Sequence, residues 1–183
     1  MTRKMKEGMV AAVLCVTLTM SACSPQWLRT ALADLPVLTQ MALNIATLVS
    51  ALQASQVSFE ETTAIQKISD EANRDLNLIE SLYKSYQANP NQSTVTKIES
   101  AIADMQQNLP ALLAAAHVRD AVVAARLSAA VNLILSTVNS FASLLPSANL
   151  PHAERRPIPS ARQLKREWNQ SVCAPGNAAC AIR

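Results

Sequence analysis

The sequence predicts an all-α protein, an antiparallel helical bundle of about four long helices with an irregular proline-rich C-terminal tail. The only glycines are Gly8 and Gly176, so the chain between them lacks a residue on which β-turns depend. Only six residues are aromatic, whereas alanine and leucine are abundant. Apolar residues recur at three- and four-residue steps over long segments, which is the period of an amphipathic helix.

The first helical segment is expected from about Trp27 to Gln56. Its apolar stripe consists of Leu38, Met41 or Ala42, Ile45, Leu48 and Leu52. Pro36 has no backbone N–H and should break a continuous helix, and Asp34 just before it can cap a new one. We therefore expect a short opening helix followed by a restart.

The second segment begins with a capping box formed by Ser58 and Glu61. In such a box each side chain accepts a hydrogen bond from the backbone N–H of the other residue. The apolar stripe that follows consists of Ile65, Ile68, Ala72, Leu76, Ile79, Leu82 or Tyr83, and Tyr86. The turn signal Asn89-Pro90-Asn91 should end this helix.

The third segment is expected from about Ser93 to Ala116, with an interruption at Pro110. The turn into the fourth segment is expected at 117–120, with Asp120 as the helix cap. A single helix from 94 to 145 is the alternative, and its length would exceed that of usual helices several-fold.

The fourth segment has no charge between Arg126 and Glu154, which is also typical of a membrane-spanning helix. Its polar residues line one side: Ser128, Asn132, Ser136, Asn139, Ser140 and Ser143. Its large apolar residues line the other side: Leu127, Val131, Ile134, Val138, Phe141 and Leu145. Because six polar side chains would be costly in lipid, we predict a buried bundle helix.

The composition changes at Pro146, since five of the nine prolines lie between 146 and 175. Residues 146–159 are predicted to form an extended linker, followed by a short amphipathic helix capped by Ser160 and ending near Val172. Two interpretations of this helix remain open. Its apolar face packs back onto the bundle, or the helix contacts a partner or an anionic surface through Leu164, Arg166 and Trp168.

The N-terminus has the pattern of an export signal. Basic residues Arg3, Lys4 and Lys6 precede an uncharged stretch from Gly8 to Ala22. These fifteen residues are too few to span a bilayer, which needs about 20. The stretch ends in Met20-Ser21-Ala22-Cys23, which resembles the lipobox of bacterial lipoproteins, with Met20 where leucine is usual.

The lipoprotein resemblance covers residues 1–24 and carries several implications. It implies that Cys23 becomes the first residue of the mature chain and carries lipid on its thiol. Ser24 resembles the sorting residue of lipoproteins sent to the outer membrane of a two-membrane bacterium. The mature chain would then face the periplasm, or would sit on the cell membrane if the host has one membrane. An ordinary cleaved signal with a cysteine nearby is the alternative.

The remaining cysteines suit an exported protein, because disulfides persist in oxidising compartments. Cys15 would be discarded with the signal and Cys23 would be lipidated, which leaves Cys173 and Cys180 to form a disulfide. The intervening Pro175-Gly176 favours a type II turn that brings the two together. We expect this bridge to fasten the end of the tail and to do little for the bundle. A metal site is not expected, because zinc requires four ligands.

The predicted domain organisation is a signal peptide at 1–22, the bundle at 23–145 and the tail at 146–183. Residues 24–150 carry seven basic and ten acidic residues, a net charge of −3. Residues 151–183 carry six basic and two acidic residues, a net charge of +4. This modest charge fits a solvated tail, and contact with anionic lipid headgroups or an anionic polymer of the cell envelope is the alternative. Nucleic acid is not an expected partner, because the compartment is wrong and stacking aromatics are scarce.

No sequence motif indicates catalysis or a cofactor. The chain lacks a glycine-rich phosphate loop, a G-x-S-x-G elbow and an H-E-x-x-H motif. Its only histidines are His117 and His152, and His117 fits a turn better than a general base. We therefore expect a non-enzymatic, membrane-tethered protein with a partner or structural role in the envelope. The alternative is a periplasmic bundle that binds an apolar ligand or cofactor in a cavity lined by Leu133, Ile134 and Phe141.

Overall fold

The computed structural model describes residues 26–52, 57–145, 158–173 and 180–183, and no β-strand occurs in these ranges. The helices are α2 (Gln26–Ile45), α3 (Leu48–Ala51), α4 (Phe59–Ala88), α5 (Gln92–Ala115), α6 (Ala121–Ala142) and α7 (Ala161–Ser171). The prediction of an all-α helical bundle is confirmed. The expected signal peptide and nearly all of the proline-rich linker lie outside the described residues.

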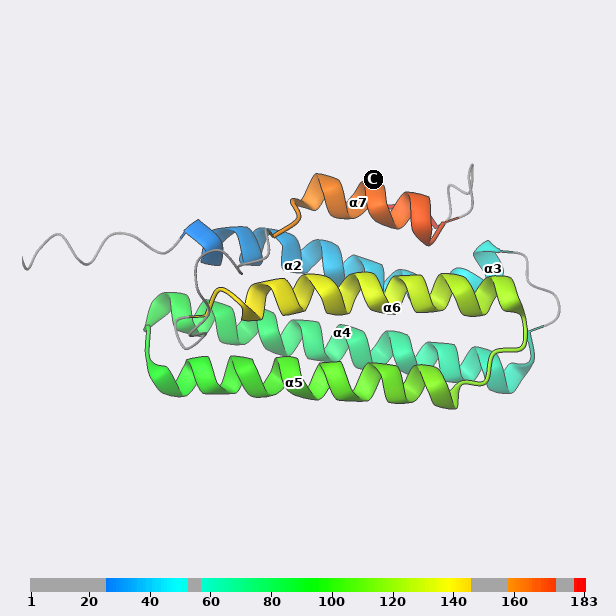
Figure 1. Cartoon of the computed structure of the whole chain (residues 1–183), viewed down its shortest axis with the longest axis horizontal. Helices are drawn as coiled ribbons and strands as arrows, with labels where there is room; N and C mark the ends of the chain where they lie inside the picture. Colours follow the sequence, from blue (N-terminus) through cyan, green and yellow to red (C-terminus); the bar gives the residue numbers. More distant parts are fainter. Residues whose placement is uncertain (1–25, 53–56, 146–157, 174–179) are drawn as a thin grey trace, which may run out of the picture.

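Four long helices form the bundle, and each runs antiparallel to the helix before it (Figure 1). Helix α2 packs against α4, α4 against α5, α5 against α6, and α6 against α2, so the four close into a ring. Helix α7 lies across the outside of the ring, on α2 and α6. The tail therefore contributes a fifth helix to the same body.

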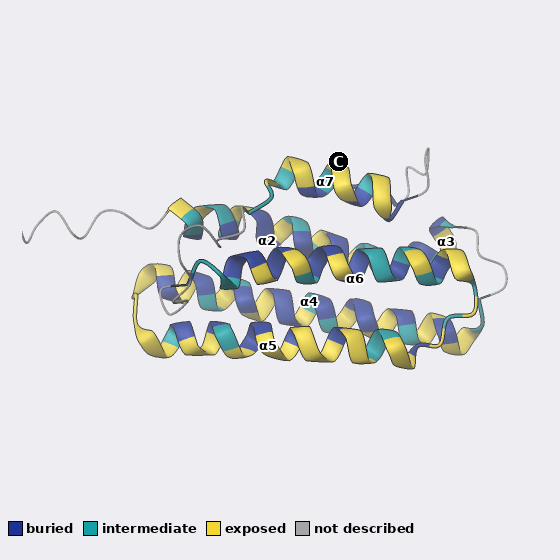
Figure 2. Cartoon of the chain, in the orientation of Figure 1, coloured by how far each residue is buried: buried dark blue, intermediate teal, exposed yellow. Residues whose placement is uncertain are grey.

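The predicted apolar stripes form the core. The six residues of the predicted apolar side of the fourth segment are all buried, five on α6 and Leu145 just beyond it: Leu127, Val131, Ile134, Val138, Phe141 and Leu145. Figure 2 shows buried positions facing the centre of the bundle and exposed positions facing outward on each long helix. Each large apolar side chain that is fully buried stabilises the fold by about 1.5–3 kcal/mol, so packing of these stripes dominates the stability of the bundle.

Side-chain caps define the helix starts as predicted. The Ser58 N–H donates to Glu61 Oε2 (2.6 Å) and the Glu61 N–H donates to Ser58 Oγ (3.2 Å), which completes the capping box of α4. The Asp120 carboxylate accepts from two backbone N–H groups at the start of α6, and Ser160 caps α7. Helix α5 is capped by Asn91, which the sequence predicted only as part of the preceding turn.

The predicted interruptions at Pro36 and Pro110 are wrong. Both prolines lie inside continuous helices, α2 and α5. Each is exposed, whereas the residue before it, Leu35 or Leu109, is fully buried. A proline in a helix costs about 3 kcal/mol, and the buried stripe that continues on both sides of it offsets this cost.

Helix α2 instead ends at Ile45, where a threonine competes for a helix carbonyl. Both the backbone N–H and the hydroxyl of Thr47 donate to the Asn44 carbonyl oxygen (3.1 and 2.9 Å). Such local bonds offer the backbone an alternative to the helical ladder. The chain then forms the short α3, and residues 53–56 of the first predicted segment lie outside the described part.

The α5–α6 turn has one residue in the left-handed region. His117 follows the last turn of α5 with φ at 44°. This conformation normally favours glycine and is a common way to terminate a helix. The prediction of a turn histidine, with Asp120 capping the next helix, is confirmed, and the single long helix from 94 to 145 is excluded.

By length and composition alone, α6 could cross a membrane, the one helix in the described ranges that could. A core helix of a soluble bundle passes the same test. In the structure α6 packs against α2, α5 and α7 through its apolar side. Its polar side includes the exposed Asn132, Ser136 and Asn139, while Ser140 is buried, so the predicted polar side departs from the observed one at that residue.

Candidate functional site

The C-terminal helix α7 is the region for which the sequence left two interpretations, and the structure decides between them. Leu164 and Trp168 are fully buried against the bundle, together with Val172 just beyond the helix. The proposed partner contact through Leu164 and Trp168 is therefore corrected, because their apolar surface is already covered by α2 and α6. Of the three predicted contact residues, only Arg166 is exposed.

The chain end is fastened to α7 and to α2 through one carbonyl. Cys173 and Cys180 are joined, with their Sγ atoms 2.06 Å apart, and both are buried. The Cys180 carbonyl oxygen accepts from Trp168 Nε1 (3.0 Å) and from Asn44 Nδ2 (3.4 Å). The predicted pairing is present, but the expectation that the bridge would do little for the bundle needs correction, because Cys180 also contacts α2.

Further polar contacts hold the end of the tail in place. The Asn169 side chain forms two hydrogen bonds with the backbone of Ile182, one to its carbonyl oxygen (3.1 Å) and one from its N–H (2.9 Å). Arg126 of α6 donates to the Ser171 carbonyl oxygen (2.7 Å), near the last carbonyls of α7. A cation at this end of a helix also complements the helix dipole.

The start of α7 is held by a buried aspartate. Asp34 lies in the middle of α2 and is 2% exposed, so its predicted role as the cap of a new helix is wrong. Its carboxylate instead accepts a hydrogen bond from the backbone N–H of Ala161, the first residue of α7. Its Oδ2 atom is buried and has no hydrogen-bond partner. Burial outweighs the opposing effect of the Ala161 hydrogen bond and raises the pKa of Asp34 to about 6.

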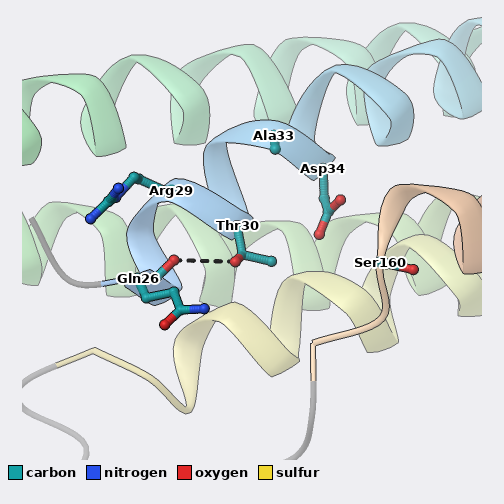
Figure 3. A pocket seen from close by; sticks show the side chains of 6 residues that line it. All are labelled: Gln26, Arg29, Thr30, Ala33, Asp34 and Ser160. Atoms are coloured by element: carbon teal, nitrogen blue, oxygen red, sulfur yellow. Dashed lines mark hydrogen bonds between the residues drawn. The ribbon is translucent and has the colours of Figure 1, made fainter.

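A groove of about 440 Å³ adjoins this contact. It is lined by Gln26, Arg29, Thr30, Ala33, Asp34 and Ser160, which belong to the start of α2 and the cap of α7. Figure 3 shows Asp34 projecting from α2 toward the start of α7, where Ser160 lies, with Arg29 at the other end of the groove. The Thr30 hydroxyl faces back along α2 and donates to the Gln26 carbonyl oxygen (3.1 Å).

The position of Asp34 on the apolar stripe of α2 is a sequence signal for a buried carboxylate, which the prediction of a helix cap overlooked. Asp34 is three residues after the buried Ala31 and four before the buried Leu38, so it interrupts the apolar stripe of α2. A charged residue on such a stripe must find a partner inside the protein. Its partner, the N–H of Ala161, is distant in sequence and could not be inferred from local spacing.

A second carboxylate holds the opposite end of the bundle together. Besides its bond with Ser58, Glu61 accepts from the backbone N–H of Arg119 (2.7 Å) and lies 3.5 Å from the Arg119 Nε. It therefore joins the start of α4 to the α5–α6 turn. The hydrogen bonds from Ser58 and Arg119 lower the pKa of Glu61 to about 2.

Several acidic side chains lie close together on α4 and α5. Burial, together with the nearby Glu71 and Asp104 and against the opposing Arg74, raises the pKa of Asp75 to about 6. Arg74 forms an ion pair with Glu71, and Asp75 Oδ1 lies 4.0 Å from Arg74 Nε. None of these residues lines the groove at α2 and α7, so the strongest carboxylate cluster and the groove are separate features.

The apolar ligand site and the lipid site suggested by the sequence stand differently in the structure, and so does the question of metal binding. In the part of the chain that the structure describes, no group of three or more histidine, cysteine or acidic side chains could hold a metal ion. Leu133, Ile134 and Phe141, the proposed lining of an apolar cavity, are buried in the core, where the Phe141 ring meets Tyr83 edge-on. Cys23, the predicted lipid attachment site, lies outside the described residues.

Comparison of the chain with protein-family models, with curated proteins and with solved structures finds no significant match. The function must therefore be argued from the residues and their arrangement.

Proposed function

We propose that this chain is a membrane-tethered bacterial lipoprotein whose helical bundle has a non-catalytic interaction or structural role in the cell envelope. The carrying observation is the position of the bundle relative to the lipobox-like motif. Helix α2 begins at Gln26, three residues after Cys23. Three residues span at most about 10 Å, so a lipid on Cys23 would hold the bundle directly at the membrane surface.

The bundle end beside the anchor has suitable chemistry for that position. Trp27 lies in the first turn of α2, and its ring centroid is 6.0 Å from that of Tyr83 and 6.3 Å from that of Tyr86. Tryptophan and tyrosine favour the interface between membrane and water. Trp27 is only partly buried, so this aromatic group reaches the surface near the start of α2.

The opposite end of the bundle is the best surface for a protein partner. Phe59, the first residue of α4, is 87% exposed, and Val122, near the start of α6, is 58% exposed. Glu61 and Arg119 hold these two helix starts together. Helix α4 has 30 residues, so this end lies about 45 Å from the anchored end. A tethered bundle would present it away from the membrane (Figure 1).

The disulfide also supports an exported location. Cys173 and Cys180 form a buried bridge, and such bridges persist in oxidising compartments rather than in the bacterial cytosol. This observation is independent of the N-terminal motif.

The test is an intact mass of the protein purified from the membrane fraction of a bacterial host, with and without reduction. We expect a chain that begins at Cys23, carries acyl groups and gains two hydrogens on reduction. Cys23→Ser is the matched control and should yield no acylated species. An unmodified mature chain in the soluble fraction would contradict the tether.

The partner surface has a separate test. A photo-crosslinking residue at Phe59 or Val122 should give a discrete adduct in intact cells. The same residue at Leu78, which is 51% exposed on α4 away from that end, serves as control and should give none. Equal labelling at all three positions would contradict a specific surface.

A further inference from the structure

Helix α7 is fastened to the bundle at two ends by different chemistry. Its C-terminal end is held by the buried Trp168, by the hydrogen bond from Arg126 and by the disulfide-linked Cys180. Its N-terminal end meets α2 through the bond between Asp34 and the Ala161 N–H. Of these contacts, only the one at Asp34 involves a group that changes charge near neutral pH.

The contact at Asp34 is incompletely satisfied. One carboxylate oxygen is buried without a donor, and burying an ionised group that lacks partners is unfavourable. Protonation removes the charge and therefore most of this cost. When α7 leaves α2, Asp34 loses its Ala161 partner, and the groove beside it gives solvent a route to the carboxylate (Figure 3).

We propose that Asp34 is a proton-linked latch, which holds α7 on α2 and α6 when protonated and lets α7 detach more readily when ionised. The proposal rests on the placement of a buried, partly unpaired carboxylate between two helices, one of which is attached to the bundle only from outside. It does not depend on the lipid anchor.

In the part of the chain that the structure describes, the charged groups around Asp34 do not alter this conclusion. On α2, Arg29 lies at the far end of the groove, and on α7 the side chain of Arg162 is exposed. Helix α6 has no charged residue after Arg126, and on α4 Glu80 and Lys84 pair with each other (2.6 Å). The pKa of Asp34 is set by burial and by the Ala161 N–H.

The size and direction of the effect follow from linkage. A carboxyl group whose pKa rises from 3.8 to about 6 on docking binds its proton more tightly in the docked state. Docking is therefore strongest below pH 3.8 and weakens as the pH rises through 6. A two-unit shift corresponds to a change of about 100-fold at most in the docking equilibrium.

The test is amide hydrogen exchange of the full oxidised chain at several pH values, expressed as protection factors. We expect protection in α7 to fall by up to about 100-fold between pH 4 and pH 8. Asp34→Asn should abolish this pH dependence. Asp75→Asn is the matched control, because the pKa of Asp75 is also raised to about 6 but Asp75 lies on α4 beside α5, and it should leave the α7 profile unchanged.

Three results would overturn the latch. They are pH-independent protection of α7 in the unmodified chain, an unchanged pH profile in Asp34→Asn, and a flattened α7 profile in Asp75→Asn. If Asp34→Asn does not fold, an NMR titration of the Asp34 carboxyl carbon in the unmodified chain is compared with the pH dependence of α7 protection. Coincident midpoints near 6 support the latch, whereas a carboxyl midpoint near 4, or a loss of protection at a different pH, excludes it.

Discussion

Two helix starts in this protein use a carboxylate in opposite ways. Glu61 at the start of α4 accepts from the N–H groups of Ser58 and Arg119, and these bonds lower its pKa to about 2. Asp34, on α2, accepts from the Ala161 N–H at the start of α7, but its Oδ2 has no donor. Its burial raises its pKa to about 6. Proximity to a helix N-terminus therefore does not decide the charge state. The balance between donors supplied and water removed does.

The difference has a structural origin. The partners of Glu61 lie on the capping turn of its own helix and on the α5–α6 turn, and each of its two carboxylate oxygens accepts from a backbone N–H. Asp34 meets only the Ala161 N–H at the start of α7, and no donor reaches its Oδ2. The first contact stabilises the ionised form and the second favours the neutral form.

The largest change in stability is expected when the packing of α7 on the bundle is weakened. Trp168→Ala deletes a fully buried aromatic side chain and should cost about 3 kcal/mol or more in the free energy of unfolding, measured with urea. If α7 then detaches, the pKa of Asp34 should fall toward 3.8, while that of Glu61 should stay low. Arg166→Ala, on the exposed side of the same helix, is the control and should change stability little.

The second prediction concerns the charge of Asp34. Asp34→Asn keeps an oxygen for the Ala161 N–H but cannot ionise. The stabilisation from protonated Asp34 is fully present below pH 3.8 and is lost as the pH rises through about 6, so the variant should gain about 1–3 kcal/mol at pH 8. At pH 4 the two proteins should unfold at the same urea concentration. A variant that is less stable at pH 8 would contradict this account.

The third prediction concerns Glu61, whose contribution to stability should depend on pH in the opposite direction to that of Asp34. The stabilisation from ionised Glu61 is present above pH 4.5 and is lost as the pH falls toward 2. Glu61→Gln should lower the melting temperature at pH 7 and flatten its decline between pH 4.5 and 2. We expect a smaller effect than for Asp34→Asn, because the charged side chain of Arg119 that faces Glu61 is 81% exposed and is screened by solvent. Glu60→Gln, an exposed neighbour on the same turn, should keep the wild-type pH profile.

The smallest expected effect lies in the turn that Glu61 holds. His117 has a φ of 44°, which glycine adopts without a steric cost. His117→Gly should therefore raise the free energy of unfolding by about 0.5–1 kcal/mol and leave the pH profile of Glu61 unchanged. A loss of stability would mean that the His117 side chain makes a contribution larger than its backbone cost.

Local rules predicted much of this fold. The capping box at Ser58, the cap at Asp120 and the cap at Ser160 each depend on residues within one helical turn, and all three are present. The apolar stripe of α6 was also predicted residue by residue. Such features depend on spacing along one helix, which the sequence displays directly.

Local rules failed where packing could override them. Pro36 and Pro110 do not end their helices, because the buried stripes around them stabilise the helix by more than a proline costs. Helix α2 ends instead where Thr47 competes for the Asn44 carbonyl. That competition is local, but the chain contains many similar polar residues, so this helix end could not be predicted from Asn44 and Thr47.

Patterns along the chain were sufficient to predict the helical class, the core-facing residues, most helix starts and the pairing of Cys173 with Cys180. That α7 covers α2 and α6, and that Asp34 meets the start of α7 rather than capping its own helix, became clear from the packed fold. The reason is that these contacts join helices distant in the chain. Their geometry depends on how whole helices pack, and a buried carboxylate acquires its charge state only from the neighbours that packing provides.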